Sequence, residues 1–152
     1  MNNSKNSIET KKILYAITKK LHEVFGDSYN IEIGEVKQGF ETPCFFVKEY
    51  NDNRQHLRGN RYHQRYSFRI LAFAQNDDII QLYNMKDKLY QVEYIQLENK
   101  DLLRCINKQT RIDDKVLQFM FDINMHLYLS DEEETKMENS IIEGGIINDE
   151  KK

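Results

Sequence analysis

Cysteine and glycine are scarce in this chain of 152 residues, which has two of the first and six of the second. Two cysteines make no disulfide framework; Cys44 and Cys105 each lie in a predicted strand, so we expect both to be buried thiols. Six glycines leave little loop material to cradle phosphates, and neither a P-loop nor a Gly-x-Gly-x-x-Gly motif occurs. These shortages argue against a disulfide-stapled fold and against a nucleotide-binding enzyme.

Long hydrophobic runs are also absent. No apolar stretch approaches the roughly 20 residues that a bilayer-spanning helix needs, and residues 1–12 are polar, unlike a secretory signal. With 39% hydrophobic and 31% charged residues, the composition predicts a soluble globular protein of the cytoplasm, without membrane partners. The length favours one domain, which we place at residues 1–130, followed by an acidic C-terminal segment at residues 131–152.

Catalytic and metal-binding motifs are missing as well. The four histidines form no His-Glu-x-x-His motif and no close cluster with cysteine: His22, His56, His63 and His126. The aspartate pairs at 77–78 and 113–114 are interpreted as a helix first turn and a hairpin turn rather than as metal ligands. We therefore predict no catalytic residue, no metal and no cofactor, in a protein that is not an enzyme.

Charge is unevenly distributed along the chain. Residues 131–152 contain three lysines against eight acids: Asp131, Glu132, Glu133, Glu134, Glu138, Glu143, Asp149 and Glu150. The segment Arg54–Arg69 contains five arginines and two histidines without any acid. Opposite charge at two places in one chain suggests complementary surfaces, within a subunit or between subunits. The arginines and tyrosines of Arg54–Arg69 suit a protein interface, and they also suit nucleic acid. A third interpretation is an exposed hairpin whose arginines are simply solvated.

Hydrophobic periodicity predicts the secondary structure. From Lys115 to Leu129 apolar side chains take every second position, which indicates one long strand with one buried face. Helical spacing predicts one helix at Ile8–Phe25, ended by Gly26, and a second that follows an N-cap at Asn76 and ends near Gln91. The other predicted strands are Tyr29–Lys37, Pro43–Tyr50, Arg61–Ala74, Val92–Glu98 and Leu102–Asn107, with polar connections at Asn51–Asn60 and Gln109–Asp114. This order, α-β-β-β-α-β-β-β, predicts an α+β fold in which two α-helices pack on one face of a mainly antiparallel β-sheet.

Four short motifs carry a resemblance to a known family. They are Lys37-Gln38-Gly39-Phe40, Pro43-Cys44-Phe45-Phe46-Val47, Arg58-Gly59-Asn60-Arg61-Tyr62 and Tyr66-Ser67-Phe68-Arg69-Ile70. Together with the helix, short hairpin and long alternating strand that follow them, they resemble the tail terminator proteins of long-tailed bacteriophages and phage-tail-like bacteriocins over residues 8–130. The resemblance implies a non-enzymatic structural protein of the virion tail or neck, assembled in the cytoplasm of the bacterial host.

The resemblance also implies partners. Such proteins form a homohexameric ring on the head-proximal end of the tail tube, where the ring ends tube polymerisation and joins the tail to head-completion or collar proteins. Contact with the tail tube protein follows, as does contact with sheath protein in a contractile tail, while DNA passes through the ring only as cargo. The candidate subunit-interface residues are Arg54, Arg58, Arg61 and Arg65 on one side and Asp131, Glu132, Glu133 and Glu134 on the other. Two alternatives stay open: another neck or tube component of the same particle, and a nucleic-acid-binding module that uses Arg54–Arg69.

Overall fold

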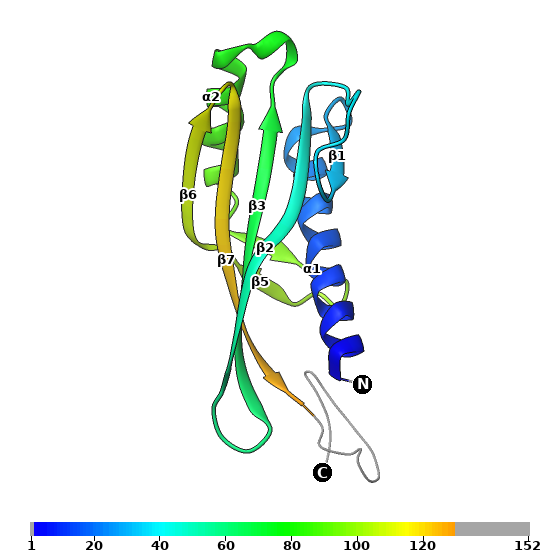
Figure 1. Cartoon of the computed structure of the whole chain (residues 1–152), viewed down its shortest axis with the longest axis vertical. Coiled ribbons are helices and arrows are strands. Elements are labelled where there is room, and N and C mark those ends of the chain that lie inside the picture. The colour runs from blue at the N-terminus through cyan, green and yellow to red at the C-terminus, as the bar shows by residue number, and fades with distance from the viewer. Residues whose placement is uncertain (1, 130–152) are drawn as a thin grey trace. The chain divides into compact units, whose positions relative to one another are not determined.

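The computed structural model describes residues 2–129, which form two α-helices, one short 3₁₀ helix and seven strands (Figure 1). In chain order the elements are α1 (Asn2–Phe25), β1 (Asn30–Ile33), β2 (Cys44–His56), β3 (Arg61–Phe73), η1 (Gln75–Asp77), α2 (Ile79–Tyr90), β4 (Tyr94–Gln96), β5 (Leu102–Arg104), β6 (Ile106–Asp113) and β7 (Val116–Tyr128). The predicted α+β class and element order are confirmed, and the structure adds one strand, β6.

The described chain divides into two compact units. Among the described residues, unit 1 holds 3–51 and 67–123, and unit 2 holds 52–66 and 124–129. Unit 1 therefore contains α1 from residue 3 onward, all of α2 and most of the strand residues. Unit 2 contains the last part of β2, the first part of β3 and the last part of β7.

The larger of the two sheets has the strand order β1-β2-β3-β7-β6, and β4 pairs with β5 in a separate antiparallel hairpin. β1 runs parallel to β2, and β6 runs antiparallel to β7. In unit 1 every second residue of β7 is buried: Leu117, Phe119, Phe121 and Ile123. The intervening residues are only partly buried. This alternation confirms the long strand predicted at the end of the described chain.

The core of unit 1 lies between one face of this sheet and the two helices. A cavity of about 20 Å³ is lined by Ile17 of α1, Leu89 of α2, Ile95 of β4 and Phe119 of β7, among others. Both helices and the small hairpin therefore cover the same face of the sheet (Figure 1). All four of these side chains are buried, so the apolar stripes read from the sequence meet in one core, where burial is the main source of stability.

Aromatic side chains bury β2 on both of its faces. Phe45 packs on Phe25 of α1, with ring centroids 4.7 Å apart, on the helix-covered face. Phe46 points the other way, where its ring lies edge-on to Phe40 (5.4 Å) and to Phe73 (5.9 Å). The connection between β1 and β2 thus places Phe40 over the second face. Aromatic pairs of this kind contribute about 0.5–1.5 kcal/mol each beyond their buried area.

The polar connection predicted at Asn51–Asn60 is wrong for its first six residues. β2 continues to His56, so the loop holds only residues 57–60. Two backbone hydrogen bonds close it, from Leu57 N to Arg61 O (3.0 Å) and from Arg61 N to Arg58 O (3.1 Å). Polar residues are weak strand formers alone, but partners on the neighbouring strand β3 override that preference.

The turn predicted at Gln109–Asp114 is also wrong, because β6 continues to Asp113. A register shift between residues 106 and 109, with Asn107 at a φ of 55°, interrupts the pattern that the sequence shows. The chain reverses instead at Asp114 and Lys115, whose φ angles are 50° and 65°. Two successive positive φ angles are typical of a type I′ hairpin turn, which suits the twist of antiparallel strands.

The N-terminal elements have other bounds than predicted. α1 begins at Asn2 rather than Ile8, since no proline or glycine interrupts the chain before Gly26. Gly26 ends the helix as predicted: its φ is 87° and its N–H donates to His22 O (2.9 Å). β1 ends at Ile33 rather than Lys37, because the following glycine has a φ of 114° and leaves the extended conformation.

The predicted N-cap of α2 is wrong as well. Asp78 caps the helix: its Oδ1 accepts hydrogen bonds from the N–H groups of Ile80 (3.0 Å) and Gln81 (3.3 Å). Asn76 lies in η1 with a φ of 55° and a ψ of 32°. That left-handed conformation differs from the extended one of an N-cap residue, so Asn76 cannot take the role.

Candidate subunit interface

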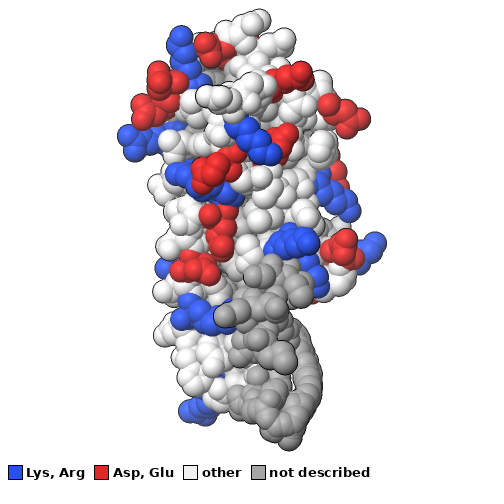
Figure 2. All heavy atoms as spheres, turned by 45° about the vertical axis from the view of Figure 1, so that its right-hand side comes forward, with Lys and Arg blue, Asp and Glu red and all other residues white. Residues whose placement is uncertain are grey.

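Unit 2 concentrates the basic side chains that the sequence singled out. Its residues 52–66 include four arginines and one aspartate. On unit 1, by contrast, basic and acidic side chains are intermixed over the face shown in Figure 2. The excess of positive charge is therefore a local property of the β2–β3 hairpin end.

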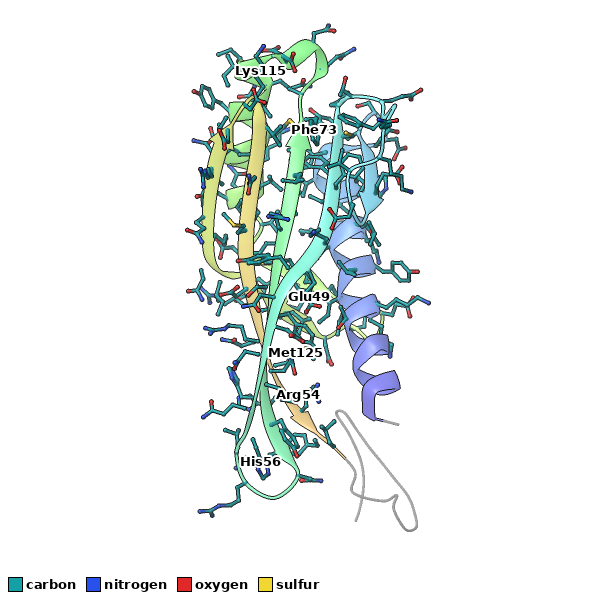
Figure 3. All side chains as sticks on the ribbon, in the orientation of Figure 1. Glu49, Arg54, His56, Phe73, Lys115 and Met125 are labelled. Atoms are coloured by element: carbon teal, nitrogen blue, oxygen red, sulfur yellow. The ribbon has the colours of Figure 1, made fainter. Side chains whose placement is uncertain are left out.

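Arg54 is held by neighbours within this hairpin. Its Nε donates a hydrogen bond to Oε1 of Gln64 (2.6 Å), and Nε2 of Gln64 donates to Oδ2 of Asp52 (3.3 Å). The Arg54 guanidinium also lies over the Tyr62 ring, 6.0 Å from its centroid. Gln64 is only 1% exposed, so a buried amide orients Arg54 and Asp52 on β2. Figure 3 shows Arg54 on this part of β2. Arg54 therefore supports the hairpin itself.

The loop at residues 57–60 is closed by His56, which lies at the end of β2 (Figure 3). Nε2 of His56 lies 2.7 Å from the carbonyl oxygen of Gly59, and its ring packs on Tyr62 with centroids 4.8 Å apart. Gly59 has a φ of 62°, which glycine adopts without Cβ strain. These contacts define the backbone that carries Arg58, in the loop, and Arg61, just after it.

The remaining basic residues of β3 lie on one face of the strand. Side chains alternate along a strand, so Arg61, His63 and Arg65 share a face, opposite to Gln64. β7 is the neighbour of β3 in the sheet, and the rings of His63 and His126 lie 5.5 Å apart, which adds His126 to this face. We call these four residues, together with Arg58 of the adjoining loop, the cationic surface.

The cationic surface has no acidic neighbour in the described part of unit 2. Asp52 is the one acid among residues 52–66 and 124–129, and it contacts Gln64 on the opposite face. Arg58, Arg61 and Arg65 are exposed and form no ion pair with any residue between 10 and 129. These three arginines are therefore available to a partner.

The structure thus separates the predicted interface residues. Arg58, Arg61 and Arg65 lie near one another at one hairpin end, whereas Arg54 is engaged in the hairpin's own contacts. The predicted acidic half of the interface lies outside the described residues and stays a prediction: Asp131, Glu132, Glu133 and Glu134. Arg69, the last arginine of the basic segment, belongs to unit 1, where its guanidinium lies over Tyr50 (5.8 Å).

Gln64 and Asp52 are structural supports that sequence reasoning missed. The available signal was the position of Gln64, which shares the buried face of β3 with Tyr66. A polar side chain at a buried position requires hydrogen-bond partners, and here Arg54 and Asp52 supply them.

The rest of the described chain offers no catalytic or metal constellation. Between residues 10 and 129 no group of three or more histidine, cysteine, aspartate or glutamate side chains is arranged to hold a metal ion. No helix within residues 2–129 is long and apolar enough to cross a membrane. Burial raises the pKa of Cys44 and of Cys105 to about 11, so both thiols stay protonated near neutral pH, as expected for core cysteines.

Comparison with known protein families shows a similarity that extends over most of the chain. The family described as phage tail terminator protein matches residues 12–136, a range that covers most of unit 1 and unit 2 and extends through Asp131–Glu134. No curated protein matches the chain. Because the family match spans most of the sequence, the chain belongs to the phage tail terminator family, a family of structural proteins of the phage tail.

Proposed function

We propose that six copies of this chain form a head-to-tail ring on the head-proximal end of the tail tube. The ring ends tube polymerisation and joins the tail to the head-completion or collar proteins. The family match over residues 12–136 is the observation that carries the proposal. The ring size follows from the resemblance to tail terminators, since a cap has to match the symmetry of the tube beneath it.

Surface features of each unit support repeated contacts in such a ring. In a head-to-tail ring, one patch of each subunit meets a different patch of the next. The cationic surface of unit 2 is one such patch, and we assign Arg58, Arg61 and Arg65 to contact with an acidic surface on an adjacent subunit or an adjoining ring. Unit 1 offers another, because the sheet face opposite the helices carries Tyr50, 43% exposed, and the partly buried Met120.

The partners follow from the position in the particle. The ring sits on the tail tube protein and presents its other side to the head-completion or collar protein. In a contractile tail it also meets the last sheath ring. DNA passes through the ring as cargo, and no membrane is involved. The protein is accordingly a component of the virion tail or neck, assembled in the cytoplasm of the bacterial host.

A cryo-EM map of the parent particle tests the ring directly. We expect six subunits at the head-proximal tail end, with Arg58, Arg61 and Arg65 within ion-pair distance of carboxylates on a neighbouring chain. A single subunit or a two-fold dimer at that end contradicts the ring. A ring at another level of the neck or tube supports the alternative of a different component of the same particle.

Nucleic-acid binding is a second candidate function, favoured because the cationic surface has no acidic neighbour in the described part of unit 2. Arginine and histidine side chains without acidic neighbours suit phosphate groups. The test is the affinity of the isolated protein for short duplex DNA as a function of salt. A steep loss of affinity with salt, removed by Arg58→Glu/Arg61→Glu/Arg65→Glu, supports this candidate; DNA as mere cargo predicts only weak binding.

A further inference from the structure

The chain leaves the described sheet next to the cationic surface. Leu129, the last described residue, is 7% exposed, and its N–H donates a hydrogen bond to the carbonyl oxygen of Asn60 (2.9 Å). Asn60 lies in the β2–β3 loop, between Arg58 and Arg61. The main chain at Leu129 is therefore fixed beside two of the three arginines that have no ion pair among residues 10–129.

Acidic residues follow immediately in the sequence. Asp131–Glu134 are four consecutive acids, and the first is two residues beyond Leu129. An extended chain spans at most about 3.3–3.6 Å per residue, so the carboxylates are within reach of the loop that carries Arg58 and begins β3 at Arg61. A partner on another molecule has no such tether.

We propose that the acidic segment Asp131–Glu134 binds the cationic surface of its own chain in the free subunit. Charge complementarity supports this occupant, since arginines that have no acidic neighbour in the described part of unit 2 lie beside an attached run of carboxylates. Exposed ion pairs are individually weak, but a short tether raises the effective concentration of the segment to about the millimolar range. Arg58 and Arg61, nearest to Leu129, are its main contacts.

The bound segment blocks other anionic surfaces from the arginines until assembly displaces it. This consequence rests on the proposed function, in which the same arginines contact an acidic surface of an adjacent subunit or ring. A surface presented by a growing ring carries several copies of that contact, whereas the segment offers one. The docking itself concerns the free subunit and does not depend on the ring.

Binding of a fluorescent heparin oligosaccharide by the full-length free subunit tests the docking. We compare the wild type with a variant in which the segment is neutralised, Asp131→Asn/Glu132→Gln/Glu133→Gln/Glu134→Gln. The neutralised variant is expected to bind heparin about tenfold more tightly at low ionic strength, because several weak charge pairs no longer compete, and the difference shrinks as salt is added. Adding Arg58→Glu/Arg61→Glu/Arg65→Glu is expected to remove the gain.

The matched control neutralises four acids farther along, outside the family match: Glu138→Gln/Glu143→Gln/Asp149→Asn/Glu150→Gln. This control changes the net charge by the same amount. If the contact of Asp131–Glu134 is local, the gain in heparin affinity of the control is expected to be well below tenfold. An equal gain in both variants means that net charge alone is responsible and overturns the proposal.

A spin label gives a direct readout of position. Cys44 and Cys105 are buried with raised pKa values, so a nitroxide reagent at neutral pH is directed to the introduced thiol of Glu133→Cys. We expect paramagnetic broadening of the amide NMR signals of Arg58 and Arg61 that persists when labelled chains are diluted into unlabelled ones. No broadening overturns the proposal, and so does broadening that appears only between chains. Because neither experiment uses assembled particles, a failed docking result is separate from a failed ring.

Discussion

At the scale of single residues, the four predicted interface arginines play two roles. Arg54 donates to a buried amide, whereas Arg61 is exposed with no ion pair among residues 10–129. Arg54→Ala is expected to lower the free energy of unfolding by on the order of 1–2 kcal/mol, because a hydrogen bond to a charged group is lost and Gln64 stays buried. Chemical denaturation, with hydrogen exchange of residues 52–66 as the local probe, measures the change.

Arg61→Ala is the matched control for that substitution. It removes the same kind of side chain from the same hairpin without breaking an ion pair with any residue between 10 and 129, so a change within about 0.5 kcal/mol is expected. Equal losses in the two variants contradict the division into a supporting and an available arginine.

The two cysteines give a prediction that depends on pH. Burial is the largest cause that raises the pKa of each thiol from 9.0 to about 11, and the charge of a carboxylate adds to it, Glu32 for Cys44 and Glu93 for Cys105. The folded state therefore holds the thiol proton more tightly than the unfolded state, and the stability present below pH 9 is lost as the pH rises toward 11. At pH 8 a disulfide reagent such as Ellman's reagent is expected to react only after denaturant is added. Rapid reaction of the folded protein contradicts the buried, protonated state.

At the scale of secondary-structure elements, the start of α2 depends on one side chain. Asp78 accepts two hydrogen bonds from the first turn, so Asp78→Ala is expected to cost about 0.5–2 kcal/mol of stability. Asp87→Ala, an exposed aspartate later in the same helix, is the control and is expected to change stability by less than about 0.5 kcal/mol. Thermal denaturation of both variants measures the difference, and equal midpoints refute the capping role.

At the scale of the whole molecule, the cationic surface is expected to act in assembly and to contribute little to folding stability. The variant Arg58→Glu/Arg61→Glu/Arg65→Glu is expected to keep the melting temperature of the wild type, because exposed charge reversals change stability only slightly. In the particle it is expected to produce tails of abnormal length or tails without a collar, because the proposed contact with an adjacent acidic surface is lost. Electron microscopy of tail lengths measures the outcome.

A second triple variant, on unit 1, is the control for the effect of net charge alone. Lys12→Glu/Lys19→Glu/Lys100→Glu makes the same change in net charge at exposed positions outside the cationic surface. Tails of normal length are expected. If the arginine variant unfolds, or if both variants disturb tail length alike, the interface assignment is wrong.

Features that depend on local periodicity and composition can be predicted from the amino-acid sequence. The alternation at Lys115–Leu129 is enough for a long strand, because one face of a strand is buried. Helical spacing followed by Gly26 is enough for the end of α1. The charge contrast between Arg54–Arg69 and Asp131–Glu134, and the motifs that resemble tail terminators, also lie in the sequence alone.

Features that depend on partners elsewhere in the chain become visible in the folded protein. Polar residues after Tyr50 become strand because β3 lies beside them, and Gln64 is buried because Arg54 and Asp52 satisfy its amide. The same pairing separates Arg54 from the other interface arginines. Whether a buried group engages a basic residue depends on the neighbouring strand, and the pattern of one segment carries no information about that neighbour.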